Sequence, residues 1–297
     1  MKKIGLIVSN ISNLYQVEID NKIYTCSARG KLKQEGITPL VGDKVEIEIT
    51  DKEKEEGIIN TVIERKNYCK RPKMANLTQI IFVVSVKMPK PDLLLLDKQL
   101  AFAEWLKVKP IIILNKIDLE KEEKVKKIEE IYTNIGYKVI KTNAKSIGKE
   151  ELNTIKEILK NNITAFSGNS GVGKSTLINA IFSNELTKEG IISQKNKKGK
   201  NTTTSVTLYK LAENEYVADT PGFSTFDITE ITKDELCHYF KEFENELVNC
   251  KYIGCSHIKE QECGIKKALE EGKIENVRYE NYCKIYEKLK EEEEHKW

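Results

Sequence analysis

The chain has 297 residues, enough for about two to three domains of ordinary size. An apolar fraction of 39% supports packed cores, and a net charge of only +3 excludes a general polycation, so a nucleic-acid surface must come from local clustering. The first apolar run stops at Val8, too early for a signal peptide, and no segment approaches the roughly 18 apolar residues of a membrane helix. We therefore expect a cytoplasmic monomer without membrane association.

Residues 1–64 read as short strands with alternating apolar positions, separated by turn signals. The expected strands are Ile4–Val8, Tyr15–Ile19, Ile23–Cys26, Val45–Ile49 and Ile58–Ile63. Five such strands without a helix of normal length predict a small barrel: an OB-fold RNA-binding domain, with an SH3-like barrel as the alternative. Its predicted loops carry cations that suit either rRNA phosphates or plain solvent exposure, namely Arg29, Lys31, Lys33 and Lys44.

Residues 65–226 change to apolar runs that alternate with helical periodicity, which predicts a parallel α/β sheet. The expected strands are Ile80–Val86, Ile111–Leu114, Tyr137–Ile140, Thr164–Ser167 and Tyr216–Ala218, with a helix over Leu93–Leu106. The polar motifs of this region follow directly on predicted strands, where an open α/β sheet binds its ligand.

The first motif is Asn115-Lys116-Ile117-Asp118, an N-K-x-D sequence at the end of a predicted strand. A carboxylate at Asp118 can accept hydrogen bonds from N1–H and the 2-amino group of guanine, whereas adenine offers neither donor. Lys116 is expected to lay its stem along the base. The segment that contains Asn143, Ala144 and Lys145 resembles the S-A-K element that touches the base through backbone, or else is an ordinary strand-to-helix turn.

The second motif is a G-x-x-x-x-G-K-S phosphate loop between a predicted strand and a predicted helix. It comprises Gly168, Asn169, Ser170, Gly171, Val172, Gly173, Lys174 and Ser175, with Thr176 opening the helix. Its backbone N–H groups and the helix N-terminus suit phosphates. Lys174 is expected on the β- and γ-phosphates, and Ser175 on Mg²⁺.

Two further elements follow the phosphate loop. Asp219 begins a D-x-x-G sequence and is expected to hold Mg²⁺ through water, with the Gly222 N–H available to the γ-phosphate. Before it, the run from Gly199 to Thr204 offers threonine hydroxyls for the metal. The neighbouring lysines suit RNA phosphates or solvent equally well.

Beyond residue 226 the pattern is helical, with a charged helix expected from about Glu275 and a cysteine cluster before it. Cys250, Cys255, His257 and Cys263 give C-x4-C-x-H-x5-C, a closed donor set for one structural Zn²⁺. Cys237-His238 is a rival ligand pair, although its flanks suggest a helix with one face in the core. The other cysteines (Cys26, Cys69 and Cys283) are expected to be small buried hydrophobes.

The order of the motifs is unusual, because the base-reading sequence precedes the phosphate loop and D-x-x-G comes last. Ordinary Ras-like GTPases have the phosphate loop first, so the domain reads as circularly permuted. Together with the Gly199-to-Thr204 element and the cysteine spacing, this order resembles the circularly permuted, small-ribosomal-subunit-dependent GTPases (the RsgA/YjeQ family) over essentially the whole chain.

The resemblance implies three domains: an OB-type barrel (1–64), a permuted Ras-like P-loop GTPase domain (65–226) and a helical zinc module (227–297). It implies a GTP hydrolase with GTP/GDP, Mg²⁺ and one zinc ion. Such a protein would bind the 30S subunit and its 16S rRNA in late assembly and hydrolyse GTP on stimulation by that particle. Matching the Gly199-to-Thr204 run to the switch element of the family assigns Thr203 to Mg²⁺, with Thr202 and Thr204 as alternatives.

The chain departs from the family pattern at the residues expected to position the attacking water. The family usually has G-R-H-T-T-T in the switch element, and this chain has Asn201 where the histidine stands. Phe223 stands where Ras-like enzymes carry the water-orienting glutamine. Asn201 can orient water but cannot shuttle a proton as imidazole does.

Two other functions are compatible with these motifs. One is a GTP-dependent RNA-binding switch with negligible turnover on another ribonucleoprotein, which Asn201 and Phe223 favour. The other is a P-loop ATPase or small-molecule kinase, against which Asp118 argues.

Overall fold

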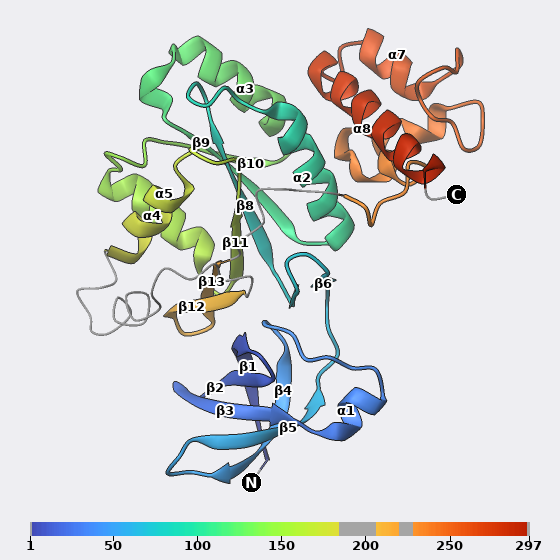
Figure 1. Ribbon diagram of the computed structural model, residues 1–297. Coiled ribbons are helices and arrows are strands. Elements are labelled where there is room, and N and C mark those ends of the chain that lie inside the picture. The colour runs from blue at the N-terminus through green and yellow to red at the C-terminus, as the bar shows by residue number, and fades with distance from the viewer. Residues whose placement is uncertain (1, 184–205, 220–227, 296–297) are drawn as a thin grey trace. The chain divides into compact units, whose positions relative to one another are not determined.

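The computed structural model describes residues 2–183, 206–219 and 228–295 (Figure 1). The chain forms two compact units, each built from several stretches of sequence. The first comprises Met1–Ile81, Ala144–Ser167 and Gly173–Ser224, and the second Phe82–Asn143, Gly168–Val172 and Thr225–Trp297. None of the helices in the described ranges is long and apolar enough to cross a membrane.

The first unit begins with a closed five-stranded barrel (Figure 1). Its elements are β1 (Lys2–Ile11), β2 (Leu14–Ile19), β3 (Lys22–Ala28), the short α1 (Gly30–Gln34), β4 (Lys44–Asp51) and β5 (Glu56–Val62). The strands pair in the order β1-β2-β3-β5-β4 and close through β1–β4, with β3 and β5 parallel. This arrangement is an OB-type barrel rather than the SH3-like alternative. Alternate side chains fill its interior, among them Ile7, Val17, Val45, Ile47 and Ile59.

A small hairpin follows the barrel, made of β6 (Tyr68–Cys69) and β7 (Met74–Ala75). Arg65, just before it, donates to the fully buried Asp43 carboxylate through Nε and Nη2, each at 2.7 Å, and fixes the chain where it leaves the barrel. The sequence pattern did not predict this hairpin, because strands of two residues are too short for an alternation to show.

The rest of the first unit is α/β. Its elements are α4 (Lys149–Leu159), β11 (Ile163–Ser167), α5 (Lys174–Ser183), β12 (Thr207–Ala212) and β13 (Glu215–Asp219). β11 and β13 are parallel, as expected, but β12 is antiparallel to β13 because a two-residue turn with Asn214 in the left-handed region (φ 57°) joins them. β12 also pairs with β1 of the barrel at Ser9 and Thr207.

The second unit contains the other parallel strands. Its elements are the later residues of β8 (Gln79–Ser85), α2 (Leu93–Leu106), β9 (Lys109–Asn115), the 3-10 turn η1 (Ile117–Leu119), α3 (Glu122–Asn134) and β10 (Lys138–Thr142). β10 lies parallel to β9, with Thr142 opposite Asn115. The observed α2 has the bounds that the periodicity predicts.

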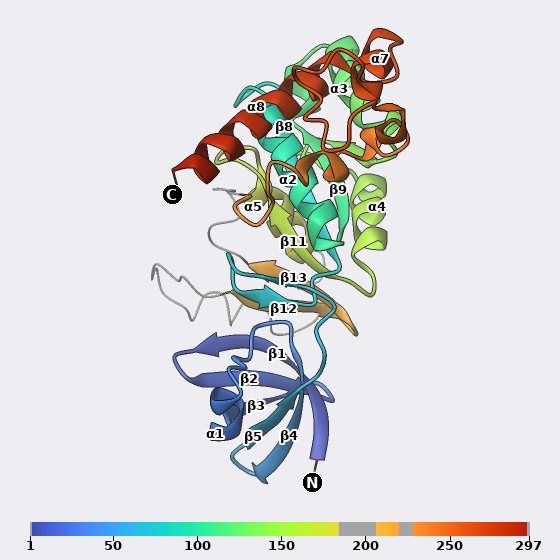
Figure 2. The same cartoon turned by 90° about the vertical axis from the view of Figure 1, so that its right-hand side faces the viewer.

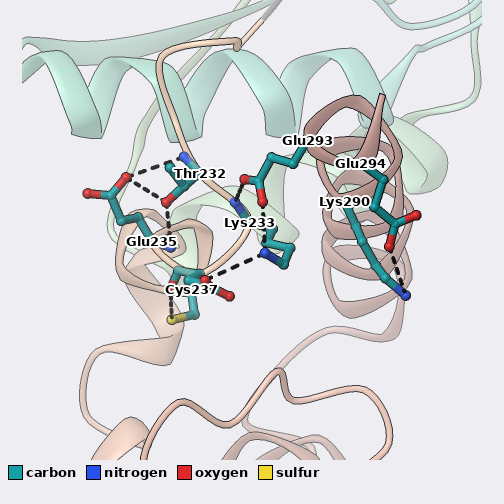
Figure 3. Close-up of polar contacts among 8 residues, drawn as sticks. Thr232, Lys233, Glu235, Cys237, Lys290, Glu293 and Glu294 are labelled. Atoms are coloured by element: carbon teal, nitrogen blue, oxygen red, sulfur yellow. Dashed lines mark hydrogen bonds and ion pairs between the residues drawn. The ribbon is translucent and has the colours of Figure 1, made fainter. Parts of the chain in front are cut away.

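Within residues 228–295, which the structure describes, the C-terminal part of this unit consists of three 3-10 turns and two helices. They are η2 (Leu236–Tyr239), η3 (Lys241–Phe243), η4 (Leu247–Asn249), α7 (Gly264–Glu270) and α8 (Asn276–Glu294). Figure 3 shows how the part begins: the Thr232 and Glu235 side chains exchange hydrogen bonds with each other's backbone N–H, as in a capping box. Lys233 donates to the Glu293 carboxylate through its backbone N (2.9 Å) and Nζ (2.7 Å), which ties this start to the end of α8.

A buried polar cluster attaches α8 to α2, beside which it lies (Figure 2). Arg278 donates to Asp97 through Nη1 (2.6 Å) and to Glu242 through Nε (2.6 Å) and Nη2 (2.9 Å). Asp97 also accepts hydrogen bonds from Tyr132 and Asn281. Burial alone lowers the pKa of Arg278, but Asp97 and Glu242 raise it well above the ordinary value, so the guanidinium is charged.

Candidate functional site

The base-reading motif lies at the end of β9, in the second unit. Asn115 is buried, and its Nδ2 donates to the Val172 carbonyl at 2.7 Å. Lys116 takes the left-handed conformation (φ 63°) and starts η1, so its side chain turns back toward the phosphate loop. Its Nζ lies 2.6 Å from the Gly171 carbonyl oxygen and also donates to the Met88 carbonyl. The motif therefore holds the loop segment Gly171–Val172 through side chain-to-backbone hydrogen bonds.

Asp118 sits in the middle of η1 with its side chain exposed. Among the described residues its carboxylate has no hydrogen-bonding or ion-pair partner, so both oxygens are available to a ligand. Thr142 lies opposite Asn115 in the β9–β10 pair, and Asn143 follows it at the same edge of the sheet. This register places the start of the Thr142–Lys145 segment beside the base-reading motif; Ala144 is buried and Lys145 exposed.

The first half of the phosphate loop belongs to the same unit. Gly168 has φ +144°, and a Cβ there would lie 2.3 Å from the Val83 carbonyl oxygen, so only glycine fits. The next residue, Asn169, donates through Nδ2 to Asp92 Oδ2 at 3.1 Å. The other oxygen of Asp92 caps α2 by accepting from the Leu95 N–H at 3.0 Å. The loop is thus fastened to the N-terminus of α2.

The second half of the loop belongs to the first unit and opens α5. Gly173 has φ +98°, Lys174 starts the helix, and Ser175 and Thr176 are exposed in its first turn. Burial lowers the pKa of the Lys174 ammonium, whereas the negative charge of Asp219, at the end of β13, acts to raise it. The N–H groups of this first turn suit an anion. The predicted residues Asn201, Thr203 and Gly222 lie outside the described residues.

The four residues of the predicted zinc set come together in the second unit. Their ligand atoms all lie within 4.8 Å of one another. His257 Nδ1 is 3.5 Å from Cys250 Sγ and 3.4 Å from Cys263 Sγ, and these sulfurs are 4.0 Å apart. A tetrahedral Zn²⁺ would space two sulfurs by about 3.8 Å and a sulfur and a nitrogen by about 3.6 Å. These three donors therefore fit that ion, Cys255 Sγ lies within 4.8 Å of each of them, and Cys237 is not among the four.

The surroundings of this cluster fix its loop. Burial lowers the pKa of His257 to about 4, so its imidazole is neutral and Nδ1 can bind a metal. The Gly264 N–H donates to Cys250 Sγ at 3.3 Å, and a Cβ on Gly264 would lie 2.3 Å from the Glu246 carbonyl oxygen. From α8, Tyr279 donates to the His257 carbonyl (2.8 Å) and Tyr282 to the Ser256 carbonyl (3.0 Å).

Comparison with known proteins decides the family. The model of the RsgA GTPase domain matches residues 62–229, and that of the RsgA N-terminal domain matches residues 4–59. The chain belongs to the RsgA family of GTPases. A curated relative from Caldanaerobacter subterraneus subsp. tengcongensis, named small ribosomal subunit biogenesis GTPase RsgA, is 40% identical over 99% of this chain and 98% of its own. A Thermotoga maritima protein of the same name is 41% identical over 97% of each chain.

Solved structures agree with the fold of this RsgA-family GTPase. The crystal structure of YjeQ from Thermotoga maritima matches with a TM-score of 0.83 and 39% identity, over 97% of this chain and 99% of that chain. The structure of YloQ, a circularly permuted GTPase, matches with a TM-score of 0.80 and 33% identity, over 98% and 96% of the two chains. The predicted family, circular permutation and enzyme class are confirmed. The individual site residues and the domain boundaries stay predictions.

One candidate surface of this RsgA-family chain was missed in the sequence. The β6–β7 hairpin and its flanks carry four exposed cations, Lys66, Lys70, Arg71 and Lys73, and none has an ion-pair partner among the described residues. The exposed ring of Tyr68 lies among them. The signal was the run from Arg65 to Lys73, with five cations and no acid. Of the predicted barrel cations, Arg29 and Lys31 instead pair with Glu48 and Glu35.

One smaller expectation is wrong: Cys26 and Cys69 are buried as expected, but Cys283 is only half-buried. The helix expected around Cys237 is a short 3-10 helix, and Leu236, Cys237 and Phe240 face the core as expected.

Proposed function

We propose that this RsgA-family GTPase acts in the assembly of the small (30S) ribosomal subunit and hydrolyses GTP when that particle stimulates it. The supporting observation is 40% identity to small ribosomal subunit biogenesis GTPases over 99% of the chain. The alignment spans the barrel and the C-terminal part as well as the GTPase domain, so the parts beyond the nucleotide motifs have counterparts in those proteins.

In the nucleotide site, Asp118 would select guanine and Lys116 would cover the base plane. The backbone of Gly168–Gly173 and the ammonium of Lys174 would bind the phosphates. Mg²⁺, held by Ser175 and Thr203 and through water by Asp219, would neutralise phosphate charge. The Gly222 N–H would face the γ-phosphate, and Asn201 would orient the attacking water by hydrogen bonding.

In the C-terminal part, Cys250, Cys255, His257 and Cys263 would hold one structural zinc ion. The donor distances match a tetrahedral site, and Gly264 N–H and the tyrosines of α8 orient the ligands and their backbone. Four protein ligands leave no open position for catalysis.

The β6–β7 hairpin would contact 16S rRNA. Cations without carboxylate partners release counterions when they meet phosphates, and an exposed tyrosine can stack on an unpaired base. The hairpin combines both features, so it suits RNA better than Arg29 and Lys31 of the barrel do, whose charges are paired.

The test is GTP turnover by the purified chain alone, with 30S subunits and with 50S subunits. Stimulation by 30S alone supports the proposal, and equal turnover in all three samples contradicts it. The second candidate, a GTP-dependent RNA-binding switch with negligible turnover, is favoured by Asn201 and Phe223. It predicts GTP-dependent binding to a ribonucleoprotein without stimulation.

A further inference from the structure

The carboxylate of Glu260 is turned back onto the backbone of the loop that precedes it. Oε1 accepts a hydrogen bond from the Ser256 N–H at 2.9 Å, and Oε2 accepts from the Ile258 and Lys259 N–H groups, each at 3.2 Å. The Ser256 hydroxyl, 2.9 Å from Oε1 and 3.0 Å from Oε2, is a fourth donor. Backbone N–H groups that converge in this way form an anion-binding nest, and here a side chain of the same loop supplies the anion.

The side chain of Glu260 is ionised at neutral pH. Burial raises its pKa, but the hydrogen bonds from the N–H and hydroxyl of Ser256 and from the Ile258 N–H act in the opposite direction, and the pKa falls to about 2. Hydrogen bonds to an ionised acceptor are roughly twice as strong as those between neutral groups. The loop is therefore held by a charged acceptor.

His257 is the residue that these hydrogen bonds enclose. Its φ of +61° lies in the left-handed region, which residues other than glycine seldom adopt. The N–H groups of the residues before and after it, Ser256 and Ile258, both donate to the Glu260 carboxylate. With the backbone in this conformation, Nδ1 lies 3.4 Å from Cys263 Sγ and also faces the sulfur of Cys250. Glu260 thus stabilises the backbone that directs the imidazole toward the other donors.

We propose that Glu260 is a positioning residue for the zinc site: it holds His257 where the imidazole can bind the ion, and zinc affinity depends on it. Both oxygens of Glu260 are engaged by donors of the loop, so it acts through the backbone and not as a further ligand. Residues that orient a metal ligand without touching the metal commonly change the affinity 10- to 100-fold. The inference rests on the proposed zinc site and assigns a role to a residue outside its donor set.

The experiment measures the zinc affinity of the full-length chain by competition with a chromogenic chelator. Glu260→Gln keeps the size of the side chain but replaces one acceptor oxygen by an amide that donates toward the backbone N–H groups. We expect zinc affinity to fall about 10- to 100-fold. The matched control is Glu262→Gln, which changes in the same way an exposed carboxylate that pairs with Lys251, and it should bind zinc like the wild type. Wild-type zinc affinity in Glu260→Gln overturns the inference.

A second comparison separates positioning from a general loss of stability. Arg278→Met destabilises the same C-terminal part through the buried cluster with Asp97 and Glu242. If Glu260 acts through His257, Glu260→Gln should lose far more zinc affinity than Arg278→Met for each degree of melting temperature lost. Zinc affinities that follow the melting temperature alike in both variants overturn the inference, because Glu260 would then support only the fold.

Ser256→Ala is a milder variant that decides the matter if Glu260→Gln does not fold. It removes the hydroxyl donor to the carboxylate and leaves the N–H groups in place, so zinc affinity should fall about 2- to 10-fold. Wild-type affinity in this variant would then overturn the inference. A wild-type chain that binds no zinc would instead refute the proposed zinc site, and this inference with it.

Discussion

The Nζ atom of Lys116 lies 2.6 Å from the carbonyl oxygen of Gly171, so the base-reading motif holds the phosphate loop directly. Asn115 adds a second bond, to the Val172 carbonyl at 2.7 Å. Two consecutive residues of one motif thus fix two consecutive carbonyls of the other. Base recognition and loop shape are coupled through these bonds.

This coupling predicts that Lys116→Met weakens GTP and GDP alike. The substitution keeps the apolar stem but removes a charged donor, worth about 1.5–3 kcal/mol or roughly 10- to 150-fold in Kd. Equilibrium titration with fluorescent GTP and GDP measures it. Lys121→Met, which changes an exposed lysine a few residues further along the chain, is the control and should bind normally. Normal nucleotide binding by Lys116→Met would contradict the coupling.

Asp118 gives a sharper test of base selection. Asp118→Asn replaces an acceptor by a donor at the 2-position, so it should reject the guanine 2-amino group and accept the 2-carbonyl of xanthine. We expect GTP affinity to fall about 10- to 150-fold and XTP affinity to rise above that of wild type. Competition between the two nucleotides measures the switch. Unchanged preference for GTP would refute the role of Asp118.

How far the sequence predicts this architecture depends on the length of each element. Two patterns are long enough to predict their elements: the alternation of Val45, Ile47 and Ile49 predicts a strand, and the apolar periodicity over Leu93–Leu106 predicts the helix α2. In the C-terminal part, Leu236, Phe240 and Phe243 have helical spacing and are indeed buried, yet they stand on 3-10 turns. Apolar spacing predicts which side chains face a core, whereas the hydrogen-bond register of such short segments depends on packing.

The candidate site divides in the same way. A contiguous motif such as the phosphate loop can be recognised from the sequence, because a single local conformation binds the ligand. The residues that hold these motifs in place by hydrogen bonds cannot be found in this way, because they are distant in the sequence. Asp92 lies 77 residues from Asn169, and Tyr282 lies 26 residues from Ser256. Only the fold brings such partners together.

The β6–β7 hairpin predicts a salt-dependent contact with RNA. K70A/R71A/K73A removes three unpaired cations, so association with 30S should weaken. The plot of log K against log salt should also become less steep, its slope decreasing in magnitude by about 2–3. Sedimentation between low and moderate salt measures both. The control K124A/K126A/K160A removes the same charge from lysines that already pair with glutamates. Equal effects of the two triples would show that only net charge matters.

The close packing of Gly264 predicts that the backbone at this position affects how tightly zinc is held. Gly264→Ala puts a methyl group 2.3 Å from the Glu246 carbonyl oxygen, which must displace the N–H that donates to Cys250. We expect weaker zinc retention against a chelator and a lower melting temperature of the C-terminal part, approaching the metal-free protein. Metal analysis after chelator titration measures it. Gly148→Ala, where φ is −72° and nothing lies within 4 Å of the added carbon, separates steric conflict from loss of glycine itself.

Arg278 predicts a large stability effect far from any ligand. Arg278→Met removes the guanidinium between Asp97 and Glu242 and leaves two carboxylates without their cation in a site where Arg278 is only 1% exposed. Breaking such a pair from one side costs about 3–5 kcal/mol. Urea unfolding of the zinc-loaded protein measures the change. Lys160→Met removes an exposed pair of the same 2.6 Å length, worth at most about 1 kcal/mol. If both variants unfold at the wild-type midpoint, the cluster contributes no more than a surface ion pair, and α8 must be held to α2 by its apolar contacts.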